Sequence, residues 1–101
     1  MDKIKKYAKM MIDEISSADK YADMAIKLKA DDKSLAEKYN EMAKQELHHK
    51  DVLAETVRHY IDECEEDKGE KCEDMETVFE FVEEIMSDMS APILTKISVL
   101  D

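Results

Sequence analysis

The sequence predicts an all-α fold, and three observations lead to that class. The chain of 101 residues contains one glycine and one proline, so it has few residues that interrupt helices. It lacks the alternating β-branched residues and the Asn-Gly or Asp-Gly turns that signal strands and hairpins. Apolar residues instead recur at steps of three and four over long stretches, which is the spacing of one helical face. We therefore expect one small helical domain over residues 1–101.

The sequence pattern of residues 1–66 predicts an antiparallel two-helix hairpin. Helical periodicity holds over about residues 2–30 and resumes over about residues 33–66. Between them, Asp31-Asp32 and the capping-box pattern Ser34-Leu35-Ala36-Glu37 mark the start of a new helix. The short connection makes the two helices antiparallel neighbours.

An acidic turn, residues 67–73, separates the hairpin from a C-terminal helix and tail, residues 74–101. Gly69 suits the left-handed position that ends many helices. We expect a third, shorter helix over about residues 74–89, which Ser90-Ala91-Pro92 should stop because proline interrupts a helix. The tail carries three apolar residues that should dock on the body of the protein or on another chain: Ile93, Ile97 and Leu100.

Each helix of the hairpin carries an apolar stripe, and three metal-binding side chains interrupt the two stripes. Buried carboxylates are normally paired, protonated or bound to a metal, so Glu14, Glu46 and His49 indicate a metal site. Glu46 and His49 form a Glu-x-x-His motif, whose spacing places both side chains on one helical face. The stripes are Tyr7, Met11, Glu14, Ala18, Tyr21, Ala25, Leu28 and Leu35, Tyr39, Met42, Glu46, His49, Leu53, Thr56, Tyr60.

The position of the turn brings these ligands to one height. A fold-back centred near Asp31 sets Glu14 level with residue 48, which lies between Glu46 and His49. One chain then supplies half of the ligand set of a di-iron carboxylate bundle, in which two helices give a Glu each and two others give a Glu-x-x-His each. We therefore expect a two-fold homodimer that forms a four-helix bundle, with the metal ions across the dimer interface.

The types of ligand favour iron. Carboxylates are hard anionic ligands, imidazole adds a neutral ligand, and no thiolate lies on the stripes to attract a softer ion. Manganese or zinc could replace iron at such a site. Tyr21 lies two turns after Glu14 on the same stripe, where it could hydrogen-bond a ligand carboxylate or donate an electron during oxygen reduction.

The composition argues against several other classes. With 15 basic and 26 acidic residues, and a net charge of −11, the chain should be repelled by nucleic acid. No apolar run reaches membrane-spanning length and no signal-peptide core follows the charged start, so we expect a soluble, cytoplasmic protein with no membrane partner. The acidic residues between Asp62 and Glu76 indicate either a solvated turn or a negative field that attracts cations.

Two cysteines, Cys64 and Cys72, flank the acidic turn. In a cytosolic protein two cysteines are most often reduced and inert. A disulfide across Gly69 and a metal cluster with His59 are the alternatives, although the cluster matches no recognised ligand spacing.

The site residues resemble those of the ferritin-like superfamily, and in particular its half-length members, the encapsulated ferritins. The shared pattern is Glu14, then Tyr21 seven residues later, then Glu46 and His49, and the resemblance covers about residues 4–60. It implies ferroxidase activity, with Fe(II) oxidised at a di-iron centre across the dimer for iron storage or detoxification.

Two further expectations come from this resemblance. Residues 43–49 are similar to the ligand helix of rubrerythrins. Encapsulated ferritins form rings of dimers inside a protein nanocompartment and carry a short C-terminal peptide that binds its shell. Residues 94–100 match that peptide loosely and lack its glycine, so a shell partner is an expectation from the resemblance alone.

A second class of function stays open at this point. The same bundle could be a non-catalytic helical interaction or assembly protein, in which a buried network of Glu and His sets the register of the dimer. Metal analysis of the purified protein distinguishes the two classes.

Overall fold

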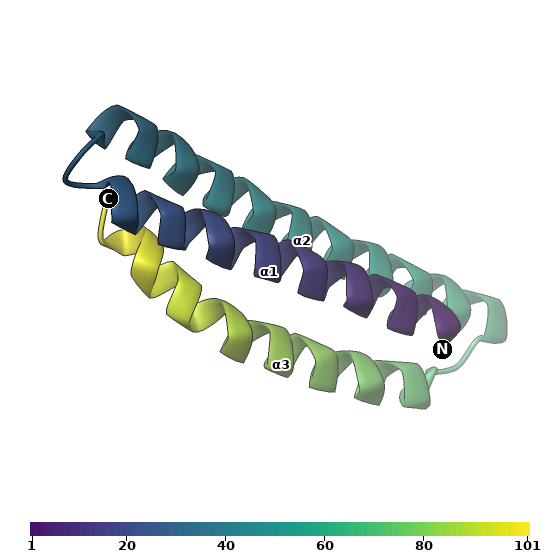
Figure 1. The fold of residues 1–101 in the computed structure, drawn as a ribbon. Coiled ribbons are helices and arrows are strands. Elements are labelled where there is room, and N and C mark those ends of the chain that lie inside the picture. The colour runs from purple at the N-terminus through teal and green to yellow at the C-terminus, as the bar shows by residue number, and fades with distance from the viewer.

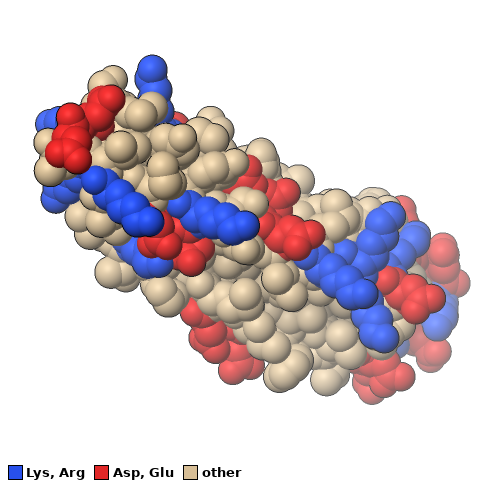
Figure 2. Space-filling view, in the orientation of Figure 1, with Lys and Arg blue, Asp and Glu red and all other residues tan.

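The computed structural model describes residues 1–101 as three helices with no strand, which confirms the all-α prediction (Figure 1). α1 spans Asp2–Leu28, α2 spans Lys33–Lys68 and α3 spans Glu73–Ser98. The chain runs along the molecule three times, so its two termini lie at opposite ends (Figure 1). The extents of 58 × 20 × 18 Å describe a rod. Figure 2 shows charged residues of both signs on one side of this rod, with uncharged areas between them.

The connection between α1 and α2 folds the chain back at the predicted place. α1 ends at Leu28, slightly earlier than predicted, and the N–H of Asp32 donates to the Leu28 carbonyl oxygen (2.8 Å). Asp32 is also the N-cap of α2, because its Oδ1 accepts the N–H of Leu35 (3.1 Å). The predicted capping box on Ser34 is therefore wrong. α2 has already begun at Lys33, and an aspartate carboxylate caps it instead.

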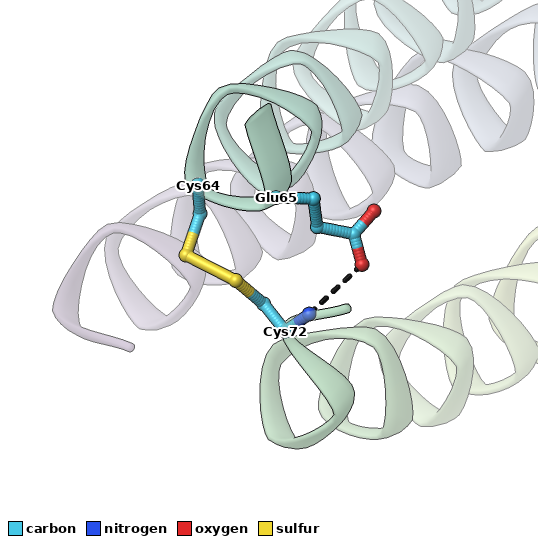
Figure 3. The surroundings of a disulfide bond; sticks show 3 residues. All are labelled: Cys64, Glu65 and Cys72. Carbon is cyan, nitrogen blue, oxygen red and sulfur yellow. Dashed lines mark hydrogen bonds between the residues drawn. A yellow bond between two sulfur atoms is a disulfide. The ribbon is translucent and has the colours of Figure 1, made fainter. Parts of the chain in front are cut away.

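The turn between α2 and α3 is closed by a disulfide. Gly69 ends α2 in the left-handed conformation (φ 66°), as predicted, and donates its N–H to the carbonyl oxygen of Glu65 (2.9 Å). Cys64 and Cys72 are bonded to each other across this turn, and the Glu65 carboxylate accepts the N–H of Cys72 (2.9 Å; Figure 3). The expectation of reduced cysteines is therefore wrong. The alternative metal cluster with His59 is wrong as well, because neither sulfur is a free thiolate.

α3 is longer than predicted because it continues through Pro92. It has 26 residues, nearly as many as the 27 of α1, so the short helix over residues 74–89 and its stop at residues 90–92 are both wrong. A proline inside a helix costs about 3 kcal/mol, but Pro92 lies on the exposed side of α3. The continued helix buries Ile93 and Ile97, and burial of two such side chains contributes about 3 to 6 kcal/mol. The expected docking of the apolar tail occurs on the body of the same chain.

α3 packs along one groove of the α1–α2 hairpin, parallel to α1. The Nζ of Lys96 lies 2.7 Å from Asp19 and 2.9 Å from Asp23 on α1. The Nδ2 of Asn40 on α2 donates to the carbonyl oxygen of Ile97 (3.1 Å). Under α3 the buried apolar side chains form two clusters: Met11, Ile15, Ala18, Ala22, Ala43, Leu47, Met86, Ile93, Ile97 and Ile4, Val57, Ile61, Phe79.

The opposite groove of the hairpin is left uncovered by α3. The buried face of α2 is turned by one residue from the predicted stripe, so that Leu47 is buried and Glu46 is half-buried. The reason is that α3 packs beside Leu47 and not beside Glu46. The residues next to the predicted stripe are therefore the ones that become buried. The predicted stripe of α2 therefore borders the uncovered groove rather than the core. The buried side chains of α2 are Ala36, Asn40, Ala43, Leu47, Val57 and Ile61.

Candidate metal centre

The three predicted ligands come together beside the uncovered groove. Glu14 projects from α1, and Glu46 and His49 project from successive turns of α2. The Nδ1 of His49 lies 3.5 Å from Oε2 of Glu14 and 3.9 Å from Oε2 of Glu46. One possible ligand atom from each residue lies within 4.8 Å of the other two. The alignment expected from a fold-back near Asp31 is thus present in the structure.

The cluster is half-open to solvent, and its two carboxyl groups interact. The side chains of Glu14, Glu46 and His49 are 27%, 23% and 55% exposed. A hydrogen bond with Glu14 raises the pKa of Glu46 above its ordinary value, and burial and the charge of Glu14 act in the same direction. His49 acts in the opposite direction. Glu46 therefore holds its proton more tightly than an ordinary glutamate, and a bound cation would replace that proton.

This set of donor atoms suits a first-row divalent metal ion. Nitrogen and oxygen ligands at about 2.0 to 2.2 Å from such an ion lie roughly 3.0 to 3.5 Å from one another around it. The distance of 3.5 Å between His49 and Glu14 lies within this range, and the distance of 3.9 Å between His49 and Glu46 exceeds it. A change of rotamer in Glu46 can close this difference without moving the helices. One chain offers three possible ligand atoms for such an ion, which would leave its other coordination positions for further ligands.

Tyrosine pairs lie on both sides of the cluster along the hairpin. Tyr21 contacts Tyr39, with 6.2 Å between the ring centroids, and Tyr7 contacts Tyr60 at 5.8 Å. A hydrogen bond with Tyr7 raises the pKa of Tyr60, and the Nζ of Lys3 lies 4.0 Å from the centroid of the Tyr60 ring. Tyr21, which was expected near the ligands, thus packs against a partner from α2.

The apolar stripe predicted for α1 did not include two methionines, Met10 and Met24, that border the uncovered groove. Met10 and Met24 are exposed there, whereas Met11 of the predicted stripe is buried in the core. Met10 lies four residues before Glu14 and Met24 three after Tyr21, which places them on the ligand face. The missed signal is a seven-residue repeat of the kind that forms coiled-coil seams. Its members on α1 are Tyr7, Met10, Glu14, Ser17, Tyr21, Met24 and Leu28.

No known protein family, curated protein or solved structure matches this chain. Of the three helices, none combines the length and the apolar character needed to cross a membrane.

Proposed function

We propose that this protein is a ferroxidase that oxidises Fe(II) to Fe(III) at a di-iron carboxylate centre shared by two copies of the chain. The observation that carries the proposal is the convergence of Glu14, Glu46 and His49 beside a groove that the chain itself leaves uncovered. The resemblance of these residues and Tyr21 to the ferritin-like pattern supports the same function.

A second copy would complete the centre. Two-fold docking of the uncovered grooves would supply each ligand twice and give the ligand set of a di-iron bundle. Exposed apolar side chains beside the groove support such docking, because a second copy would remove their apolar surface from water. These side chains are Met10, Met24, Leu35 and Met42. The four-helix bundle would contain α1 and α2 of each copy and leave α3 outside.

The chemistry calls for two iron ions, because reduction of dioxygen to hydrogen peroxide takes two electrons. Two Fe(II) ions give one electron each and two protons are taken up, so the products are two Fe(III) ions and one hydrogen peroxide. The carboxylates of Glu14 and Glu46 would balance the charge that iron gains, and His49 would add a neutral ligand. Tyr21 is proposed to hydrogen-bond a ligand carboxylate or to donate an electron.

The proposed role is iron storage or detoxification by a homodimer or by a ring of dimers. Binding of a protein shell through the C-terminal tail would require the end of α3 to unfold. Residues 94–98 belong to α3, and Ile97 is buried against the hairpin, so an extended tail would first have to leave the core.

A second candidate is a non-catalytic helical assembly protein. One observation favours it: His49 contacts both Glu14 and Glu46, and the two carboxyl groups interact with each other. A polar network of this kind can fix the register of a helical dimer without any catalysis.

Aerobic oxidation of Fe(II) by the purified protein tests the proposal. Wild type should form ferric iron faster than buffer does, and Glu46→Ala and His49→Ala should lose most of that gain. The matched controls are His59→Ala and Glu63→Ala, which remove an exposed His–Glu pair (2.9 Å) from the same helix and should leave the rate unchanged.

Equal rates for wild type and buffer would contradict the ferroxidase proposal. The assembly protein becomes the better account if wild type also holds no iron, manganese or zinc after loading with each metal.

A further inference from the structure

A second exposed apolar area lies on the side of the rod where α1 and α3 are next to each other. It contains Ile12 of α1 and Phe81, Ile85 and Met89 of α3, all of them exposed. Phe81 is 62% exposed, more than any other large apolar residue of the chain. In a chain with 41% charged residues, a phenylalanine followed by two apolar side chains at four-residue steps marks an interaction surface.

Contacts at the far end of α3 show that these residues border one groove. Ile12 shares a helical stripe with Asp19 and Asp23, which follow it by seven and eleven residues. Ile85 shares a stripe with Lys96, eleven residues later. Because Lys96 contacts both aspartates, the two stripes face each other between α1 and α3. Ile12 and Ile85 therefore lie on the two sides of the same groove.

Two edges of opposite charge border this area, which we name the α1–α3 face. Lys5 and Lys9 are exposed on α1 near Ile12, and Glu84 and Asp88 are exposed on α3. In Figure 2, an uncharged area over the middle of α3 lies between blue side chains near the beginning of α1 and red side chains along α3. A strongly basic or acidic partner would meet like charge on one edge, whereas a second copy can match both edges.

We propose that the α1–α3 face binds the same face of a second copy, about a two-fold axis parallel to the rod. Such an axis turns the basic edge of each copy toward the acidic edge of the other and keeps each residue at its height. Lys9 lies two residues before Met11, and Glu84 lies two residues before Met86. Met11 and Met86 line the same pocket, and further along Lys96 contacts Asp19 and Asp23, so these two methionines lie at about the same height. Lys9 of one copy therefore comes level with Glu84 of the other. The exposed apolar side chains then meet between two such ion pairs.

This contact is separate from the candidate metal centre and does not rest on the proposed function. Ile12 lies two residues before Glu14, so the two side chains point about 200° apart around α1. α1 can therefore contact a different copy on each side. Either contact alone gives a dimer, and the two together give a larger assembly.

Ile85→Glu tests the face, with Leu94→Glu as the matched control. Leu94 is 56% exposed on the same helix, but it lines the groove between α2 and α3 with Lys50 and Ala54. The mass of the full chain is measured by analytical ultracentrifugation after EDTA treatment, at several micromolar concentrations. Ile85→Glu should weaken association about tenfold or more, and Leu94→Glu should associate like wild type. Circular dichroism should show that both variants remain helical.

An exchange of charges tests the pairing itself. Lys9→Glu and Glu84→Lys should each weaken association about tenfold, because each places like charges together, and the double variant should restore it. His49→Ala should leave this metal-free association unchanged, so failure of the metal centre and failure of this contact appear in different variants. A monomeric wild type, or association that survives Ile85→Glu, would overturn the proposal, as would a double variant no stronger than the single ones.

Discussion

Among single residues, Glu46 is the one whose protonation should depend most directly on whether the site binds a metal. A hydrogen bond with Glu14 raises its pKa above the ordinary value of 4.5. The folded, metal-free protein therefore holds a proton on Glu46 more tightly than the unfolded chain does. The stability that this group contributes is fully present below pH 4.5 and is lost as the pH rises through the raised folded value. A bound metal reverses this preference because it binds the ionised form.

We predict that Glu46→Gln stabilises the metal-free protein at neutral pH and abolishes its metal binding. Glutamine resembles the protonated carboxyl group but carries no negative charge for a cation. Urea unfolding of EDTA-treated protein should therefore show a smaller loss of stability between about pH 4.5 and pH 7 in the variant. Glu41→Gln changes an exposed carboxylate on the same helix and should keep the wild-type slope. Identical slopes for wild type and Glu46→Gln would contradict the raised pKa of Glu46.

At the scale of helices, local sequence predicted their existence and alignment, but not which faces they bury. The height of Glu14 beside Glu46 followed from the turn, because capping at Asp32 is a local property. The burial of Leu47 in place of Glu46 depends on where α3 packs, which spacing within α2 does not reveal. Pro92 is a second example. The helix-breaking tendency of proline predicts that α3 ends before it, but the burial of Ile93 and Ile97 beyond the proline favours a continued helix.

The disulfide between α2 and α3 should stabilise mainly α3. Cys64 and Cys72 are separated by 8 residues, and closing a loop of this size contributes about 2 to 3 kcal/mol in the chain-entropy account. Reduction should lower the free energy of unfolding by that amount and should speed hydrogen exchange in α3 more than in α1.

The double variant Cys64→Ser/Cys72→Ser is the control for this experiment. It should resemble the reduced wild type and should not respond to reductant. Unfolding curves of oxidised and reduced wild type that coincide would contradict the stabilising role.

For the whole molecule, association and metal binding should be linked. Each chain carries a net charge of −11, so two copies repel each other as their acidic surfaces approach. Metal ions held between the copies would offset part of that repulsion. Anything that binds the folded assembly and not the unfolded chain also stabilises it by mass action.

We predict that Zn(II), used as a redox-inert probe, raises both the Tm and the average mass of the assembly. At a free concentration about 100 times the Kd, the expected stabilisation is about 2.7 kcal/mol. His49→Ala should lose both effects, and sodium chloride at the same ionic strength should not reproduce them. A rise in Tm without a rise in mass would place the metal within one chain and contradict the shared centre.

A rod built from three helices has a direction that can be detected from outside. Its first and last residues lie at opposite ends of a molecule 58 Å long (Figure 1). Two rods related by an axis along their length have their beginnings at the same end, whereas an axis across the length places the beginnings far apart. A fluorophore on the first residue of each chain would therefore self-quench in the first arrangement and stay bright in the second. A single label at one end of each rod thus identifies the geometry of a pair.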